Sequence, residues 1–125
     1  MPAILIVDDE FPIRTLISLS LQAEGLTVYD AGNGREAVDI FHQHADEIDL
    51  LLTDVVMPEM DGPALVRELV AERPQLRVVF ISGCCDIVNL SAPRRIYFLA
   101  KPFDISELVS TVQMALKEDL SEVAA

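Results

Sequence analysis

The feature that most constrains this chain is a set of short apolar runs without alternating polar residues. Residues 3–7, 48–52, 78–81 and 96–100 form such runs, and residues 26–29 form a weaker fifth run. An apolar run without alternation suits a strand that is covered on both faces, as in a parallel sheet. We therefore expect a parallel sheet with helices packed on both of its faces.

Helical patterns lie between these runs. Apolar side chains recur at helical spacing, and residues that favour helix starts precede them: Asn33 with Glu36, Pro63, and Asp104 with Glu107. Strands that alternate with helices predict the α/β class, here an open, doubly wound, five-stranded parallel sheet. Residues 83–95 are the exception, because they leave room for about two helical turns at most. We expect a short or irregular fourth helix there.

Length and charge narrow the class of protein. The 125 residues suit one domain spanning 1–125, and no apolar run approaches the ~20 residues that cross a bilayer. Nine basic against 21 acidic residues give a net charge of −12, which disfavours direct nucleic-acid binding. The start lacks the basic region of a signal peptide, and the two adjacent cysteines make no disulfide framework. We expect a soluble, acidic protein of the cytoplasm that binds no membrane.

Polar residues end four of the apolar runs. They are Asp8, Asp9 and Glu10, then Asp54, then Ser82, and then Lys101. In a parallel sheet these ends lie along the carboxyl edge, where such folds bind ligands. Taken singly, each residue reads as a helix cap, a loop residue or a turn. Their joint placement predicts a site.

The residue types at these ends suit phosphoryl chemistry. Clustered carboxylates repel one another unless a cation offsets their charge, and oxygen ligands favour Mg²⁺. A carboxylate such as Asp54 can act as the nucleophile on phosphorus. Lys101 and the Ser82 hydroxyl can contact the phosphoryl oxygens and offset their charge.

Four sequence blocks resemble those of response-regulator receiver domains in order and spacing. They are IVDDE at 6–10, LLTDVVMPEMDG at 51–62, ISG at 81–83 and KPF at 101–103. The resemblance implies a flavodoxin-like sheet with strand order 2-1-3-4-5. It also implies a phosphoacceptor role in a two-component signalling system or phosphorelay.

The resemblance assigns a role to individual residues of this chain. Asp54 matches the phosphoacceptor, Lys101 the lysine that pairs with phosphoryl oxygens, and Ser82 the hydroxyl that bonds the phosphoryl group. Asp9 matches the direct Mg²⁺ ligand, Asp8 a ligand that acts through water, and the backbone carbonyl of Val56 a third ligand. Phe98 stands at the position of the family's Tyr/Phe switch residue, and the Lys101–Pro102 bond is usually cis in the family.

The chain departs from the family pattern in two places. The stretch between Ser82 and Lys101 is about three residues shorter than in typical receivers. This puts in doubt the usual coupling between Ser82, Phe98 and the surface that contacts a partner. Phe98 lacks the hydroxyl of a switch tyrosine, while the neighbouring Tyr97 faces the other side of its strand. Val56 cannot readily position an attacking water, so we expect a long-lived aspartyl phosphate.

The expected function is Mg²⁺-dependent phosphoryl transfer to Asp54 from a histidine kinase or a histidine phosphotransfer protein. Phosphorylation is then expected to switch a surface that an unknown downstream protein binds. Such a domain catalyses only its own phosphorylation and dephosphorylation. One alternative is a docking module that has the fold without phosphorylation. A phosphohydrolase is disfavoured, because Val55 and Val56 follow Asp54 where a second acid is needed.

Overall fold

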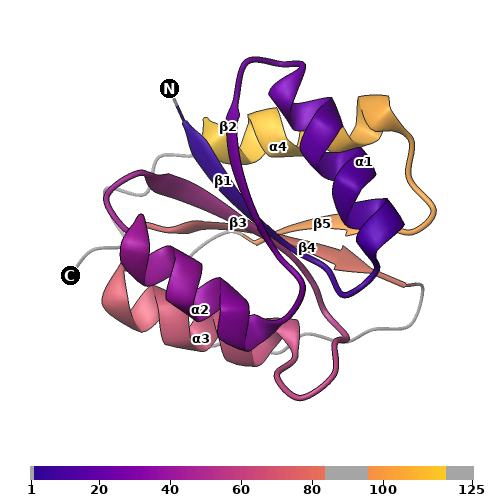
Figure 1. The fold of residues 1–125 in the computed structure, drawn as a ribbon. Coiled ribbons are helices and arrows are strands. Elements are labelled where there is room, and N and C mark those ends of the chain that lie inside the picture. Colours follow the sequence, from indigo (N-terminus) through magenta and orange to yellow (C-terminus); the bar gives the residue numbers. More distant parts are fainter. Residues whose placement is uncertain (1, 84–95, 118–125) are drawn as a thin grey trace.

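The computed structural model describes residues 2–83 and 96–117, which form a sheet between two layers of helices (Figure 1). All strands of the described residues run parallel, in the order β2-β1-β3-β4-β5. This order confirms the doubly wound, flavodoxin-like sheet expected from the sequence. The strands are β1 (Ala3–Val7), β2 (Thr27–Ala31), β3 (Ile48–Asp54), β4 (Arg77–Ser82) and β5 (Tyr97–Ala100).

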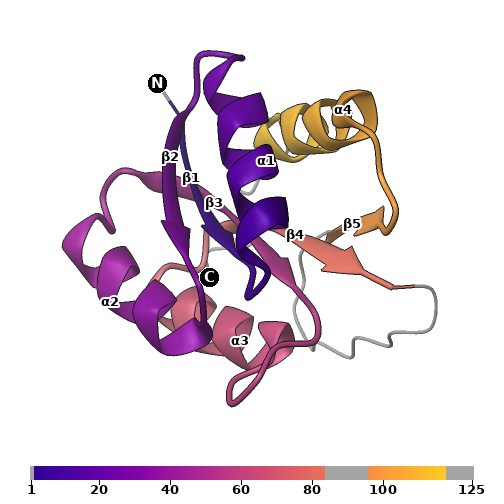
Figure 2. The same cartoon turned by 45° about the vertical axis from the view of Figure 1, so that its right-hand side comes forward.

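Helices cover both faces of the sheet. Helices α1 (Phe11–Gln22) and α4 (Ile105–Leu116) lie side by side on one face (Figures 1 and 2). Helices α2 (Gly34–Gln43) and α3 (Gly62–Glu72) lie together on the other face. None of these helices has both the length and the apolar character that a bilayer span requires.

Strand β1 explains why the apolar runs do not alternate. Its Leu5 and Val7 belong to the core beneath α2 and α3, whereas Ile4 and Ile6 belong to the core beneath α1 and α4. Every residue of β1 is buried. Because successive side chains of a strand point to opposite faces, a strand covered on both sides needs an apolar residue at every position.

Strand β2 lies at an edge of the sheet and differs from its predicted position. The sequence indicated residues 26–29, but the strand runs from Thr27 to Ala31. It pairs only with β1, and Ala31 is its only buried residue. Because an edge strand is partly exposed, its apolar signal is weak, and the prediction of its bounds was wrong by up to two residues.

The predicted caps begin two of the helices. The Asn33 side chain accepts a hydrogen bond from the Glu36 amide at 2.8 Å at the start of α2. Asp104 and Glu107 form a complete capping box at the start of α4. Side chains therefore satisfy amide groups that the first turn of each helix leaves without partners.

Helix α3 begins one residue earlier than the position of Pro63 indicated. Asp61 is its N-cap and accepts a hydrogen bond from the Ala64 amide at 2.8 Å, so Gly62 is the first helical residue. Asp61 satisfies the free amide here, and Pro63, which has no amide hydrogen to satisfy, occupies the second position.

The predicted short or irregular helix over residues 83–95 lies, apart from Gly83, outside the described residues. It stays a prediction.

Candidate functional site

The carboxyl edge of the sheet brings together polar residues that are far apart in the sequence. Asp54 is the last residue of β3, Asp8 follows β1, and Lys101 follows β5. In the register of β1 and β3, Val7 pairs with Thr53, so Asp8 and Asp54 come next to each other. These three strand ends therefore converge at the carboxyl edge of the sheet, where folds of this class bind ligands.

Lys101 connects two acidic residues of this edge. Its ammonium Nζ lies 2.9 Å from Oδ1 of Asp54 and 3.5 Å from Oε1 of Glu10. Its backbone amide donates to the carbonyl of Ser82 at 2.9 Å, which fixes where the side chain starts. The Lys101–Pro102 peptide bond is cis. The lysine is thus held at its base by β4 and at its tip by Asp54.

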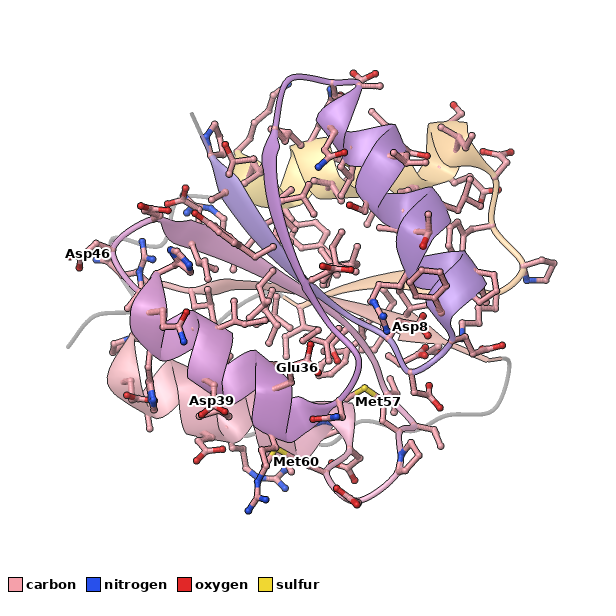
Figure 3. The ribbon with its side chains drawn as sticks, in the orientation of Figure 1. Asp8, Glu36, Asp39, Asp46, Met57 and Met60 are labelled. Carbon is pink, nitrogen blue, oxygen red and sulfur yellow. The ribbon has the colours of Figure 1, made fainter. Side chains whose placement is uncertain are left out.

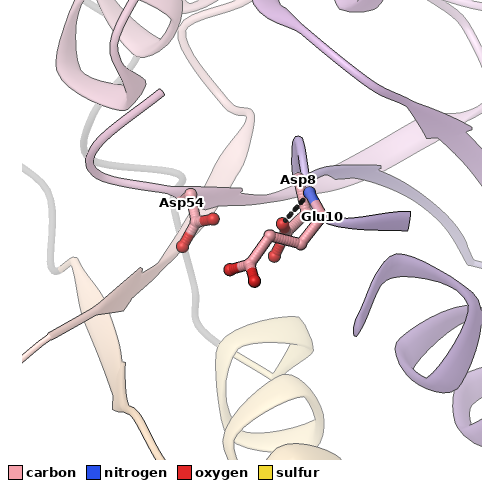
Figure 4. Close-up of side chains that lie close together, drawn as sticks. All are labelled: Asp8, Glu10 and Asp54. Carbon is pink, nitrogen blue, oxygen red and sulfur yellow. Dashed lines mark hydrogen bonds between the residues drawn. The ribbon is translucent and has the colours of Figure 1, made fainter. Parts of the chain in front are cut away.

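Three carboxylates gather at this edge, as Figure 4 shows. Asp8, Glu10 and Asp54 each offer an oxygen, and these oxygens lie within 4.8 Å of one another. The Asp8 side chain is buried, and its Oδ1 accepts a hydrogen bond from the Glu10 amide at 2.8 Å. Its other oxygen, Oδ2, is buried and has no hydrogen-bond partner in the part of the chain that the structure describes. A buried carboxylate oxygen without a partner is costly, so this cluster is short of positive charge.

The backbone around Asp54 is held tightly. The Thr53 hydroxyl donates to the Asp54 carbonyl at 3.0 Å, and the Gly62 amide donates to the Val55 carbonyl at 2.9 Å. A Cβ atom at Gly62 would lie 2.2 Å from the Asp54 carbonyl oxygen, so only glycine fits there. The start of α3 therefore packs directly on the residue that carries the central carboxylate.

Burial raises the pKa of Asp54 to about 7. The hydrogen bond from Lys101 opposes this effect, and the charge of Asp8 adds to it. Only 4% of Asp54 is exposed, so its carboxylate relies on neighbouring groups instead of water.

Burial also raises the pKa of Asp8, although the hydrogen bond from the Glu10 amide opposes it. For Lys101, burial acts to lower the pKa, but the hydrogen bond and charge of Asp54 outweigh it and the pKa is raised. The raised pKa values of Asp8 and Lys101 reflect the same surroundings. The edge holds more negative than positive charge in a poorly hydrated place, so it favours protons or cations.

Comparison with known families decides what kind of domain this is. Residues 4–113 match the response regulator receiver domain. The chain belongs to this family. Receivers serve as phosphoacceptor domains in two-component signalling, and the family is generally a non-enzymatic signalling module.

Curated relatives of this receiver domain differ in length. It is 40% identical over 118 residues to the sensor kinase CckA of Brucella abortus, covering 92% of this chain and 12% of that protein. It is 34% identical to the response regulator receiver protein CpdR of the same organism, covering 93% of this chain and 98% of the relative. The chain thus spans about one eighth of the first relative and nearly all of the second.

Solved structures agree with the family. The receiver domain of the hybrid histidine kinase CckA superposes with a TM-score of 0.79 at 35% identity, over 92% of this chain and 99% of that one. A receiver domain protein from Clostridium thermocellum superposes with a TM-score of 0.81 at 25% identity, over 93% and 94% of the chains. Relatives of this kind do not favour the alternative of a docking module without phosphorylation.

The carboxylate cluster of this receiver fits a hard divalent cation. Its ligand atoms are all oxygens, which suit Mg²⁺. The unpartnered Oδ2 of Asp8 is a free ligand atom, and the raised pKa values of Asp8 and Asp54 reflect repulsion and desolvation that a cation relieves. Asp8 and Asp54 are the residues best placed to hold such an ion.

Two of the ligands implied by the resemblance have no such support. Asp9 is exposed and lies outside the three-carboxylate cluster, where Glu10 stands instead. Val56 is 67% exposed and lies just beyond β3. The roles of Asp9 and of the Val56 carbonyl therefore stay predictions.

The two residues predicted to act as a switch lie on the fourth and fifth strands. Ser82 ends β4 at the same edge, where its hydroxyl donates to the Gly83 carbonyl at 2.8 Å. Phe98 lies within β5, is 53% exposed, and stacks on Phe80 with 5.8 Å between ring centroids. Tyr97 packs on the opposite core, beneath α1 and α4. The expected opposite facing of Tyr97 and Phe98 is therefore present, while the switching roles stay predictions.

Glu10 was expected among the polar residues of this edge, but the sequence indicated no role for it in the site. Its position before a helix indicated a cap, but it makes no side-chain cap bond and reaches Lys101 instead. The relevant signal was present in the block 8–10, where every residue is acidic. Which acidic side chain joins the cluster depends on how the chain turns from β1 into α1, and spacing alone does not determine that turn.

Proposed function

We propose that Asp54 of this receiver domain accepts a phosphoryl group from a phosphohistidine on a histidine kinase or a histidine phosphotransfer protein. The observation that carries this proposal is the 2.9 Å contact between Lys101 Nζ and the buried Asp54 carboxylate, beside two further carboxylates. A nucleophile that contacts a cationic side chain and belongs to a cation-attracting cluster suits phosphoryl transfer.

The reaction follows from these positions. An Asp54 oxygen forms a bond to phosphorus as the bond between phosphorus and the histidine nitrogen breaks, and the electron pair of that bond stays on the imidazole. Lys101 offsets negative charge on the phosphoryl oxygens. Asp8 and Asp54 would hold Mg²⁺, which when bound would supply further positive charge for the phosphoryl group. Asp54 must be deprotonated to attack, and Lys101 favours that form.

An apolar hollow beside the site supports a protein as the phosphodonor. The hollow has a volume of about 370 Å³ and is lined by Ile13, Leu16, Lys101, Pro102 and Phe103. Phe11, on the same helix as Ile13 and Leu16, is 66% exposed. Apolar surface next to the reacting carboxylate suits a protein partner that buries it during transfer.

The remaining parts of the proposal concern output and setting. Ser82 and Phe98 are proposed to change position on phosphorylation and to alter a surface read by a downstream protein, with 1–125 acting as a single receiver domain. The domain then turns over only its own phosphoryl group and is not an enzyme toward other substrates. A net charge of −12 supports the absence of direct nucleic-acid binding, and adjacent cysteines without a disulfide framework support a cytoplasmic setting.

Intact mass after incubation with a small-molecule phosphodonor tests this function. We expect one added phosphoryl group that requires both Mg²⁺ and Asp54, so that Asp54→Asn or a chelator abolishes it. Asp39→Asn is the matched control, because Asp39 is exposed on α2 away from the site (Figure 3). An adduct that persists in Asp54→Asn, or none from either a small-molecule or a phosphohistidine donor, overturns the proposal.

A further inference from the structure

Arg14, near the start of α1, contacts the same strand end as the carboxylate cluster. Its Nη1 donates to the backbone carbonyl of Asp8 at 2.7 Å, and its Nε lies 3.1 Å from Oδ2 of Asp30. Only 16% of its side chain is exposed. The guanidinium thus connects the end of β1 to β2, through a carbonyl on one side and a carboxylate on the other.

The contact with Asp8 completes a set of three bonds on one residue. The Asp8 amide donates to the Ala31 carbonyl at 3.2 Å, and the Asp8 Oδ1 accepts from the Glu10 amide. Arg14 takes the remaining backbone group, the carbonyl. With its amide, its carbonyl and one carboxylate oxygen all bound, Asp8 keeps one polar atom without a hydrogen-bond partner among the described residues, the Oδ2 of its carboxylate. These bonds fix the direction in which Oδ2 points.

The surroundings of Arg14 are shaped for a guanidinium. A Cβ atom at Gly32 would lie 3.1 Å from Nη1, so the glycine leaves space beside β2 for the group. The guanidinium carbon also lies over the ring of Phe11, 5.3 Å from the ring centroid. A planar fork with several donors can reach Asp8 and Asp30 together, which a lysine ammonium cannot do in the same way.

Arg14 could affect cation binding through its positive charge or through its hydrogen bond to Asp8, and these two roles predict opposite effects of its removal. A positive charge near a cation site weakens cation binding by Coulomb repulsion. If Arg14 acted only through its charge, its removal would tighten binding. If it acts through the hydrogen bond to Asp8, its removal weakens binding because the ligand oxygen loses its fixed direction.

We propose that Arg14 is a positioning residue for the divalent-cation site, holding the turn from Asp8 to Glu10 while Asp30 anchors it to β2. The inference rests on the proposed function, because it concerns the cation that the proposed phosphoryl transfer requires. Arg14 does not touch the reacting atoms. It acts through the backbone of Asp8.

A titration with Mn²⁺ as the probe tests this role without any measurement of phosphorylation. Free Mn²⁺ is measured by electron paramagnetic resonance while the full chain is titrated. We expect Arg14→Ala to bind Mn²⁺ about tenfold more weakly than wild type, the loss typical for a residue that orients a metal ligand. Arg14→Lys keeps the charge but not the fork, and we expect an intermediate affinity.

Arg67→Ala is the matched control, because Arg67 is an exposed arginine on α3. It removes the same charge, and we expect an affinity equal to wild type or slightly tighter. Asp30→Asn tests the anchor: it should weaken Mn²⁺ binding a few-fold in wild type and have no further effect in Arg14→Lys. This lack of additivity is a readout that a general loss of stability does not produce.

The outcomes separate the inference from the function beneath it. Equal or tighter Mn²⁺ binding by both Arg14→Ala and Arg14→Lys overturns the inference alone. A wild-type chain that binds no Mn²⁺ overturns the proposed cation site and the inference with it. Circular dichroism in the presence of a chelator shows whether each variant is folded without a metal ion. If Arg14→Ala is unfolded, Mn²⁺ binding by Arg14→Lys and Asp30→Asn decides whether the inference holds.

Discussion

The two ends of strand β3 each carry an aspartate, and the fold surrounds them differently. Asp49, near the amino end, accepts a hydrogen bond from the Ala3 amide at 3.2 Å and lies 3.4 Å from Arg73. Its side chain is 32% exposed. Asp54, at the carboxyl end, is nearly buried with one ammonium group and two other carboxylates.

This difference distinguishes an aspartate in a balanced ion pair from the aspartate that is proposed to accept the phosphoryl group. At the amino end, Arg73 also donates to the carbonyls of Ala45 and Ile48, so charges and backbone groups there are matched. At the carboxyl end, negative charge is in excess and the Asp8 Oδ2 has no partner. A site proposed to bind a cation needs such an excess of negative charge, and this excess lowers the stability of the fold.

The largest expected effect concerns the rigid backbone at the carboxyl end. In Gly62→Ala, the new Cβ atom meets the Asp54 carbonyl, so we expect a loss of about 3 kcal/mol in the free energy of unfolding. Gly34→Ala is the control, because its Cβ meets the flexible side chain of Met60 and should cost about 1 kcal/mol. Urea unfolding measures both. Equal losses would show that the Asp54 carbonyl is not tightly packed.

The second prediction concerns the charge of Asp54 itself. Its carboxyl has an ordinary pKa of 3.8, and the fold raises this pKa to about 7. Between pH 3.8 and about pH 7 the folded state therefore binds a proton that the unfolded state has lost. The resulting stability is fully present below 3.8 and lost as the pH rises through 7. In chelator at pH 8, Asp54→Asn should therefore stabilise the fold by about 2 kcal/mol.

Asp49→Asn provides the contrast at the other end of β3. It weakens a partly exposed ion pair with Arg73, so we expect a loss of about 0.5 kcal/mol at the same pH. Thermal and urea unfolding at pH 4 and pH 8 measure the two variants. Destabilisation of the fold by Asp54→Asn at pH 8 would contradict the excess of negative charge at the carboxyl end.

The third prediction concerns the cation. Mg²⁺ at ten times its dissociation constant should stabilise the wild-type fold by about 1.4 kcal/mol, and a chelator should reverse this. The gain should be larger at pH 8 than at pH 5, because at pH 5 the cation must displace the proton of Asp54. Asp49→Asn should keep the gain and Asp54→Asn should lose most of it. An equal gain in both variants places the ion elsewhere.

The smallest expected effect concerns the lifetime of the phosphorylated state. Val56 is exposed just beyond Asp54, and its hydrocarbon side chain cannot hold an attacking water molecule. We expect Val56→Asn, whose carboxamide can hold one, to lose the phosphoryl group several-fold faster than wild type. The decay of the phosphorylated mass over time measures this. Decay of the wild type within seconds, or equal rates, would contradict the expectation.

The sequence predicted the parts of the site that depend on strand ends. Asp8, Asp54 and Lys101 follow buried apolar runs, and burial on both faces makes such runs easy to locate. Edge strand β2 was located less well, because its half-exposed residues carry little apolar signal.

Other parts of the site depend on how the chain turns after β1. Three features follow from the turn into α1: the contact of Glu10 with Lys101, the place of Asp9 outside the carboxylate cluster, and the hydrogen bond from Arg14 to the Asp8 carbonyl. Such a turn is set by backbone hydrogen bonds and by packing against β2. Residue spacing along the sequence does not determine these contacts, so they appeared only in the structure.

Locating the phosphoryl group within the chain tests the central claim most directly. Borohydride reduces an aspartyl phosphate to homoserine, and tandem mass spectrometry then identifies the altered residue. Asp49 and Asp54 lie in the same tryptic peptide, residues 36–67, so one spectrum compares both ends of β3. The account predicts homoserine at position 54 alone, and only when Mg²⁺ was present. Homoserine at position 49, or at any acidic residue in place of 54, would contradict it.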